Sequence, residues 1–195
     1  MSKGIKTKET ILNTALQLTS KFGLESLSIG ELAKSVGMSK SGLFGHFKSK
    51  EKLQIMVLDY AAENFTQQVI IPALKKPRGL PRLEAMMMNW KKWSGSYMTG
   101  GCPFLSSIVE YDDRPGNVRD HVKLLQETMI GSFERALRVS NEENQIRSNV
   151  DIKQAGYEIY ANMIAYHIYS RLLGDKNSDK MFTANFDKII TSIKV

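Results

Sequence analysis

The residues best suited to chemistry in this sequence lie in one short stretch, SKSGLFGHFKSKEKL, which runs from Ser39 to Leu53. Its lysine side chains can contact phosphate groups, and the free N–H groups at a helix start can bind phosphate as well. Its small residues would let the backbone come close to a ligand. Leu43 and Phe47 are four residues apart, so they would share one helix face. These properties favour contact with a polyanion.

The positive charge of the chain is concentrated where this stretch lies. The whole sequence carries a net charge of +7, and residues 1–52 hold nine Lys and four Glu, a net of +5. The rest of the chain therefore contributes only +2. A local basic field suits a polyanion, because each neutralised phosphate releases counterions. A solvated surface helix with surplus lysine would give the same count, so the charge alone leaves both interpretations open.

Composition limits the class of protein. A chain of 195 residues can bury a core without disulfides, and 42% hydrophobic with 24% charged residues is typical of a soluble globular protein. The single cysteine, Cys102, allows no internal disulfide, which fits a reducing cytoplasm. We find no secretory signal and no stretch of spanning length, so the expected location is the cytoplasm.

Apolar residues recur at helical spacing, and alternating strand patterns are nearly absent, which predicts an all-α protein of about nine helices. Ser28 and Glu31 form a capping box that opens a short helix, Gly37 ends it, and Ser39 caps the next. Two short helices joined by a glycine turn make a helix-turn-helix, whose second helix enters the major groove of DNA. The later predicted helices cover about 49–72, 82–97, 103–111, 117–139, 151–173 and 178–193.

Residues 11–53 resemble the DNA-binding domain of TetR-type transcriptional regulators. The resemblance covers the helix end at Phe22-Gly23, the cap and turn in SIGELAKSVGMS, and the signature LFGHFKSKEKL. It implies a helix-turn-helix domain at residues 1–50 and an effector-binding and dimerisation domain at 51–195. The implied partners are double-stranded operator DNA, a small-molecule effector and a second copy of the chain. No membrane partner, cofactor or enzymatic activity is expected, because the sequence has no spanning stretch, no paired carboxylates, no nucleophile–base spacing and no phosphate-cradling glycine loop.

The resemblance also implies which residues contact DNA. Phe44 stands where the family usually has tyrosine, so a hydroxyl contact with phosphate is lost. Gly45 has no side chain with which to read a base. The implied phosphate contacts come from Ser28, Ser39 and Lys50, the base or groove contacts from Lys40, Ser41, Gly42 and Gly45, and Phe44 and His46 pack at the DNA backbone.

Methionine and aromatic residues gather in the later helices and suit an adaptable apolar pocket. The alternative is that these side chains only fill the core. Together with the resemblance, they indicate a pocket for a small apolar or aromatic effector. The predicted pocket residues are Met87, Trp90, Trp93 (or Ser94), Tyr97, Cys102, Phe104, Leu125, Met129, Tyr160, Met163 and His167.

The last two predicted helices, about 151–173 and 178–194, carry apolar residues on more than one face, which predicts a homodimer through them. A repressor released from a palindromic operator by its effector is the favoured function. Cys102 precedes Pro103 and would lie near a helix N-terminus, where a thiol is more reactive. A thiol-based electrophile- or redox-sensing repressor is therefore one alternative, and a DNA-binding protein without a small ligand is another. The histidines have no companions at ligand spacing, so no metal site is expected.

Overall fold

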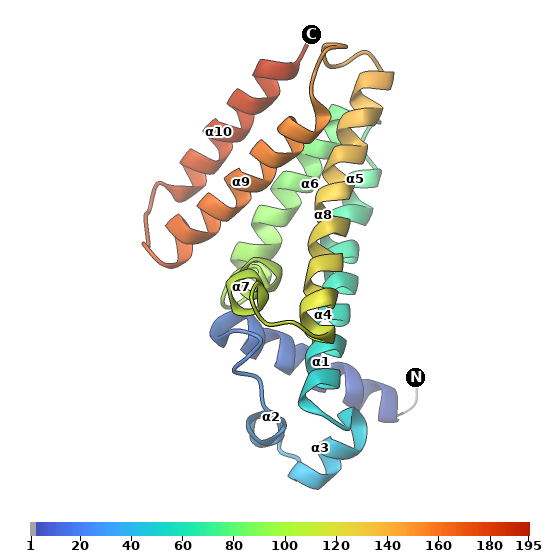
Figure 1. Cartoon of the computed structure of the whole chain (residues 1–195), viewed down its shortest axis with the longest axis vertical. Coiled ribbons are helices and arrows are strands. Elements are labelled where there is room, and N and C mark those ends of the chain that lie inside the picture. The colour runs from blue at the N-terminus through green and yellow to red at the C-terminus, as the bar shows by residue number, and fades with distance from the viewer. Residues whose placement is uncertain (1–2) are drawn as a thin grey trace. The chain divides into compact units, whose positions relative to one another are not determined.

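The computed structural model describes residues 3–195, with side chains from Lys8 onward, and the chain divides into two compact units. The first unit consists of the chain up to Thr66 and Trp93–Leu125, and the second of Gln67–Lys92 and Gln126–Val195. The regular elements are helices, apart from an isolated bridge between Ile146 and Lys194. The predicted all-α fold is therefore confirmed over the described residues (Figure 1).

The first unit contains the three short N-terminal helices and the elements packed on them. Its helices are α1 (Lys3–Phe22), α2 (Ile29–Ser35), α3 (Lys40–Phe47), α4 (Lys50–Phe65), the π-helix η2 (Trp93–Tyr97), α7 (Pro103–Tyr111) and the start of α8 (Asn117–Glu142). α1 packs on α2, α4 and α7, and α3 packs on α2 and α4. Leu32, Leu43 and Phe47 are fully buried, as the spacing of the last two predicts.

Serine caps fix where three consecutive helices begin. The Oγ atoms of Ser28, Ser39 and Ser49 each accept a hydrogen bond of 3.1 Å from the backbone N–H three residues later. Each bond satisfies one of the N–H groups that have no partner at a helix start. The caps therefore set the starts of α2, α3 and α4 and with them the length of the turn between α2 and α3.

A close backbone approach attaches the loop before α7 to α1. The N–H of Gly100 donates to Ser20 Oγ (2.9 Å), and the Ser20 hydroxyl donates to the carbonyl of Gly101 (2.8 Å). A Cβ atom at residue 100 would collide with the backbone carbonyl of Ser20, so only glycine fits at this position. The contact holds the start of α7 against the helix that precedes the helix-turn-helix.

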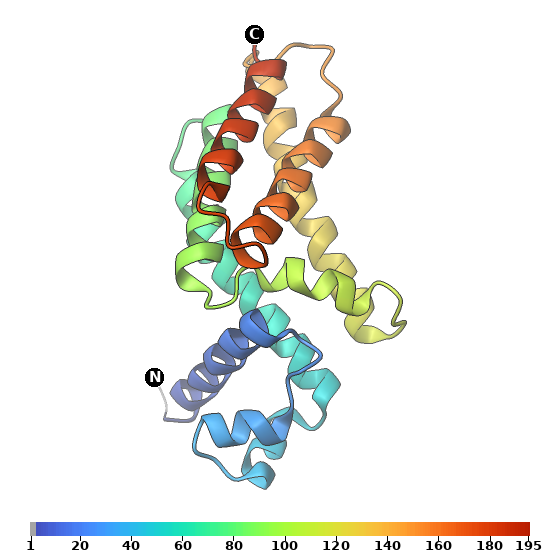
Figure 2. The same ribbon diagram turned by 90° about the vertical axis from the view of Figure 1, so that its left-hand side faces the viewer.

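The second unit is a set of helices around an aromatic cluster. Its elements are most of η1 (Thr66–Ile70, π-helical), α5 (Ile71–Leu74), α6 (Leu80–Lys92), the rest of α8, α9 (Ile152–Arg171) and α10 (Ser178–Ile193). Trp90 of α6 meets Tyr166 of α9 and Phe182 of α10 with ring centroids 5.8 and 5.7 Å apart. α9 and α10 lie side by side in both ribbon views (Figures 1 and 2).

The structure departs from the predicted helix bounds in two kinds of place. The helices expected at 49–72 and 82–97 each contain a π-helical turn, η1 and η2, which a 3.6-residue periodicity cannot reveal. α8 continues to Glu142, beyond the predicted end of this helix at about residue 139. The other predicted helices agree with the structure to within a few residues.

Candidate nucleic-acid interface

The predicted DNA-contacting residues of α3 lie on its exposed side. Phe44 is 51% exposed, and Lys40, Ser41, Gly45 and His46 are also exposed. The opposite side of the helix is buried through Leu43 and Phe47. A Cβ atom at Gly45 would meet no atom within 4 Å, so this position adds no bulk to an open surface. α3 therefore presents lysine, hydroxyl groups and small residues outward, as the major-groove helix of a helix-turn-helix requires.

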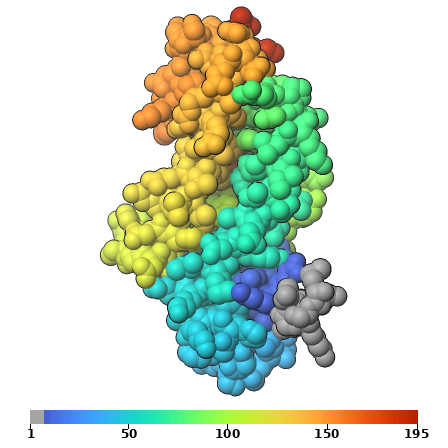
Figure 3. All heavy atoms as spheres, turned by 90° about the vertical axis from the view of Figure 1, so that its right-hand side faces the viewer, coloured from blue at the N-terminus to red at the C-terminus, as the bar shows by residue number. Residues whose placement is uncertain are grey.

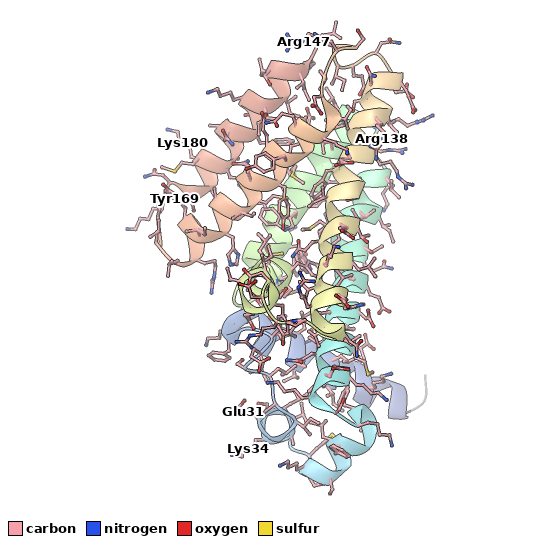
Figure 4. The ribbon with its side chains drawn as sticks, viewed as in Figure 1. Glu31, Lys34, Arg138, Arg147, Tyr169 and Lys180 are labelled. Carbon is pink, nitrogen blue, oxygen red and sulfur yellow. The ribbon has the colours of Figure 1, made fainter. Side chains whose placement is uncertain are left out.

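The two capping serines are already engaged in the helix starts. Ser28 Oγ accepts from Glu31 N–H and also donates to Glu31 Oε2 (3.2 Å), which completes the predicted capping box. Ser39 Oγ accepts from the N–H of Gly42 and lies 3.3 Å from Ser41 Oγ. Figure 4 marks Glu31 and Lys34 on α2, both exposed. The hydroxyls of Ser28 and Ser39 thus organise the helix starts that a phosphate would approach.

Lys50, a predicted phosphate contact, is paired inside the protein. Its Nζ donates to the carbonyl oxygen of Glu25 (2.6 Å) and to Glu25 Oε1 (2.9 Å). Both side chains remain 44% exposed, so the ion pair lies at the surface. A phosphate would have to share this ammonium with Glu25. The exposed side chain of Lys40, in contrast, forms no hydrogen bond or ion pair within residues 8–195.

Glu25 is the centre of a hydrogen-bond network within the first unit. Tyr111 Oη donates to Glu25 Oε2 (2.8 Å), and Arg114 lies 3.6 Å from the same oxygen. The side-chain amide of Gln54 donates to Tyr111 Oη (2.7 Å) and to the carbonyl of Leu24 (3.0 Å). The loop between α1 and α2 is therefore bonded to α4 through Lys50 and Gln54 and to α7 through Tyr111.

Glu110, the residue before Tyr111 in α7, also binds the loop between α1 and α2. Its two carboxylate oxygens accept the backbone N–H groups of Leu24 (3.2 Å) and Glu25 (2.6 Å). A Cβ atom at Gly23, whose φ is +89°, would collide with this carboxylate. Glycine at residue 23 therefore serves the left-handed turn that ends α1 and also admits Glu110.

The network shifts the pKa values of its two central groups in opposite directions. The hydrogen bond from Lys50 lowers the pKa of Glu25; partial burial opposes this, and the hydrogen bond from Tyr111 adds to the lowering. Burial, followed by the hydrogen bond to Glu25, raises the pKa of Tyr111. Tyr111 is therefore a neutral donor and Glu25 a charged acceptor at neutral pH, the strong combination of a charge-assisted hydrogen bond.

The predicted pocket residues divide between the two units. In the first unit, Trp93 stacks on Phe104 with centroids 5.9 Å apart, Cys102 is buried, Leu125 is half-buried, and Tyr97 is exposed. In the second unit, the buried side chains are Met87, Trp90, Met129 and Met163, and the half-buried ones are Tyr160 and His167. The effector pocket formed by these residues stays a prediction.

Two of the predicted pocket residues are tryptophans whose indole N–H groups have no hydrogen-bond acceptor in the described residues. Trp90 Nε1 and Trp93 Nε1 are buried and form no hydrogen bond within residues 8–195. Leaving a buried donor unsatisfied costs about 1–3 kcal/mol. Each indole therefore offers a donor to any acceptor that enters its aromatic cluster.

The surroundings of Cys102 and of the histidines bear on the predicted thiol and metal chemistry. Cys102 is fully buried at the N-cap of α7, with Pro103 as the first helical residue, as predicted. Burial withholds the sulfur from electrophiles in solution. Burial, with a smaller contribution from Arg171, lowers the pKa of His167. His121 is paired with Asp59 (2.8 Å), and no group of three metal-ligating side chains occurs among the described residues.

Among the helices that the structure describes, none combines the length and the apolar character that a membrane span needs.

Comparisons with known proteins agree with this geometry. Residues 79–186 match the family described as Tetracyclin repressor-like, C-terminal domain, and residues 11–55 match the bacterial regulatory proteins of the tetR family. The HTH-type transcriptional regulator AcrR of Shigella flexneri is 36% identical over 59 residues, 30% of this chain and 27% of AcrR. The chain thus spans about a quarter or less of the curated relatives it matches.

Solved structures share the fold over nearly the whole chain. A TetR transcriptional regulator from Chloroflexus aurantiacus superposes with a TM-score of 0.88 at 23% identity, with both chains covered completely. AibR, in complex with isovaleryl coenzyme A and operator DNA, gives a TM-score of 0.73 at 21% identity over 93% of this chain and 97% of its own.

The chain belongs to the TetR family, because the C-terminal family match covers more than half of it and the N-terminal match covers the helix-turn-helix. It is a DNA-binding transcriptional regulator, and the family assignment confirms the prediction that it is not an enzyme.

No pattern in the sequence predicts the network of Glu25, Gln54, Glu110 and Tyr111. Glu25 and Tyr111 are separated by 86 residues, and no periodic pattern relates positions in different helices. The only local signal is the polar residue Gln54 on the buried side of α4, where it is 4% exposed. A buried polar side chain needs a partner, and here the partner is Tyr111.

Removing the Glu25 charge should make the stability of the protein less dependent on pH. Because folding lowers the pKa of Glu25, its stabilisation is fully present above the ordinary value of 4.5 and is lost as the pH falls through the lowered value. Glu25→Gln should therefore reduce the free energy of unfolding at pH 7 by about 1 kcal/mol, given the exposure of the pair. Thermal denaturation between pH 3 and 7 measures this, and the difference from wild type should shrink in acid.

Asp187→Asn is the matched control for Glu25→Gln, because Asp187 is exposed on α10 and lies outside the Glu25 network. The two variants lose the same charge. An equal pH dependence for Glu25→Gln and wild type would show that the network does not stabilise the carboxylate.

Proposed function

We propose that this regulator is a homodimeric repressor that a small apolar or aromatic effector releases from a palindromic operator. The exposed side of α3, with Lys40, Ser41 and small residues above a buried apolar side, is the observation that carries the DNA part of the proposal. The division into residues 1–50 for DNA binding and 51–195 for effector binding and dimerisation is part of it. A bacterial regulator meets chromosomal DNA in the cytoplasm, so we propose that location.

In this proposal the phosphate contacts come from the starts of α2, α3 and α4, through Ser28, Ser39 and Lys50. The groove contacts come from Lys40, Ser41, Gly42 and Gly45, with Phe44 and His46 against the DNA backbone. The single lysine among the groove contacts and the two glycines supply few side-chain hydrogen bonds to base edges. Sequence preference would then depend partly on the shape and deformability of the operator.

The homodimer part rests on an exposed apolar surface over α9 and α10. Tyr157 is 68% exposed and Leu172 is 81% exposed, with Ile168, Tyr169, Leu173 and Met181 also exposed. Tyr169 and Lys180 point away from the neighbouring helices (Figure 4). Ala161, Ala165 and Ile189 line a hollow of about 460 Å³ between these two helices. Small residues beside large apolar ones allow another helix to approach closely, and a two-fold axis would align two α3 helices on a palindrome.

The effector part is supported by the unpartnered indoles. Trp90 Nε1 is buried beside Tyr166 and Phe182, and Trp93 Nε1 is buried beside Phe65 and Phe104. An apolar or aromatic molecule with one acceptor atom would satisfy such a donor while it fills the cluster. Release from the operator requires that the effector bind the DNA-free conformation more tightly than the DNA-bound one. AibR shows that a protein of this fold is found with both an acyl coenzyme A and operator DNA.

Lys40→Ala should weaken binding to all DNA, because its positive charge attracts the phosphates of any sequence, and it should weaken operator binding most, because Lys40 is proposed as a groove contact. The slope of log affinity against log salt should fall by about one. Genome-wide mapping of bound DNA supplies the operator, and fluorescence anisotropy at several salt concentrations supplies the slope. Lys153→Ala on α9 is the control that loses the same charge elsewhere. If Lys40→Ala shows the same salt slope as the wild type, Lys40 does not lie in the DNA interface. Lys50→Ala tests separately whether the Lys50 ammonium leaves Glu25 to bind a phosphate.

Ala165→Arg should convert the protein to a monomer, because it places a charged side chain in the small-residue hollow of α9 and α10. Operator affinity should fall at least tenfold, since each monomer would engage one half-site alone. Sedimentation equilibrium measures the mass. Gln67→Arg adds the same charge outside α9 and α10 and should remain dimeric. A dimeric Ala165→Arg protein would contradict the proposed interface.

Trp90→Phe should fold normally and still bind the operator, because it removes a donor that has no partner in the protein. It should lower the affinity for any effector that accepts a hydrogen bond from this indole by about tenfold. A thermal-shift screen of neutral aromatic metabolites, with indole as the first probe, identifies candidates, and gel shifts test release from the operator. If every compound that releases the operator binds Trp90→Phe and Trp93→Phe unchanged, the aromatic clusters are not the effector site.

A further inference from the structure

A hollow of about 630 Å³ lies within the second unit, between α5, α6 and α8. Its charged lining consists of three arginines, Arg82, Arg135 and Arg138, and no carboxylate belongs to the lining. We call it the arginine hollow. Figure 3 shows this face of the unit, with green atoms of the α5–α6 region beside the yellow and orange atoms of α8. A volume of this size is typical of sites for small organic molecules.

The rest of the arginine hollow is largely apolar. Ile70 and Leu74 contribute from the η1–α5 segment, Met86 from α6, and Ala136 and Val139 from α8. Leu74 is 48% exposed, so part of this apolar wall is open to solvent. Positive groups and an apolar wall in one concave surface are complementary to a molecule with a negative head and a hydrocarbon tail.

The arginines keep donors available for an anion. The side chain of Arg135 is exposed and forms no hydrogen bond or ion pair with the described part of the chain. Arg138 Nη1 lies 3.3 Å from Glu134 Oε2, and Arg82 Nε donates to the carbonyl of Lys76 (3.0 Å). Each guanidinium has five N–H donors, so these contacts leave most of them unused.

The acidic residues beside the arginine hollow do not neutralise it. Glu142 and Glu143, at the end of α8, pair with Arg78 at 3.6 and 3.4 Å, and Arg78 is not part of the lining. Glu134 contacts only Arg138 among the three arginines. Two positive charges of the hollow therefore remain without an acidic partner.

Gly131 keeps part of the arginine hollow open. It lies inside α8, where glycine costs about 1 kcal/mol of helix stability relative to alanine. A Cβ atom at this position would meet no described atom within 4 Å, so no neighbour of the helix requires glycine here. The missing side chain leaves space that belongs to the lining of the hollow.

We propose that the arginine hollow binds an amphipathic organic anion, with its carboxylate or phosphate held by the guanidinium groups and its apolar tail against the Ile70, Leu74 and Met86 side chains. Paired guanidinium donors match the two oxygens of a carboxylate or phosphate. This site is separate from the aromatic clusters around Trp90 and Trp93, and its existence does not depend on release from an operator.

Isothermal titration of the full chain with octanoate tests the site. Octanoate should bind saturably, with one site per chain. Octan-1-ol, which has the same tail without the charge, and acetate, which has the head without the tail, should each bind at least tenfold more weakly. Octyl phosphate separates the two possible heads: the tighter of the two anions identifies the head that the arginines prefer. No saturable heat with either anion, or equal affinity for octan-1-ol, would overturn the proposal.

Substitutions in the lining test whether octanoate binds at the arginine hollow. Arg135→Gln should weaken octanoate binding about tenfold or more, whereas Arg171→Gln, which removes an exposed arginine of α9, should leave it unchanged. Gly131→Phe should abolish binding by filling the space, and Gly131→Ala should retain it while raising the melting temperature. The alanine and glutamine variants keep the test valid if the phenylalanine variant does not fold. Undiminished binding by Arg135→Gln would place octanoate elsewhere.

Operator binding measured with and without octanoate separates this site from the proposed function. If octanoate binds in the hollow and operator affinity does not change, the site stands and has no part in release. If other compounds release the operator while octanoate and octyl phosphate do not bind, the repressor proposal stands and the anion site is wrong.

Discussion

The carboxylate of Glu25 accepts hydrogen bonds from Lys50 and Tyr111, and through them the loop before α2 is joined to both α4 and α7. The angle at which α2 and α3 are presented depends on this loop, because its residues connect α1 to the helix-turn-helix. Two adjacent residues of α7 take part, since Glu110 holds the loop backbone while Tyr111 holds the Glu25 side chain. A change in the position of α7 would therefore reach the loop that leads into α2 through these hydrogen bonds.

The helix-turn-helix itself could be predicted because its determinants are local. Serine caps lie three residues from the N–H groups that they satisfy, and the buried pair Leu43 and Phe47 is four residues apart. Each of these relations fits within one helical turn, so the sequence displays it directly. The long helices of the second unit were predictable for the same reason, from apolar residues at helical spacing.

The remaining features depend on which helices come together, and that is not a local property. Tyr111 and Gln54 meet across 57 residues, and the three arginines of the hollow come from α6 and α8. The π-helical turns η1 and η2 were also missed, because one extra residue in a turn leaves the apolar pattern on either side intact. Trp90 and Trp93 are only three residues apart in the sequence, and they belong to different compact units.

The division of both units into two chain segments has a consequence for synthesis of the protein. The first unit needs residues up to Leu125, because Glu110 and Tyr111 complete the contacts of the loop at Leu24 and Glu25. A ribosome that has released only the helix-turn-helix has not yet supplied these partners. The second unit cannot complete its packing until α10, near the end of the chain, has been synthesised. The loop before α2 therefore acquires its full set of hydrogen bonds only after more than half of the chain has emerged.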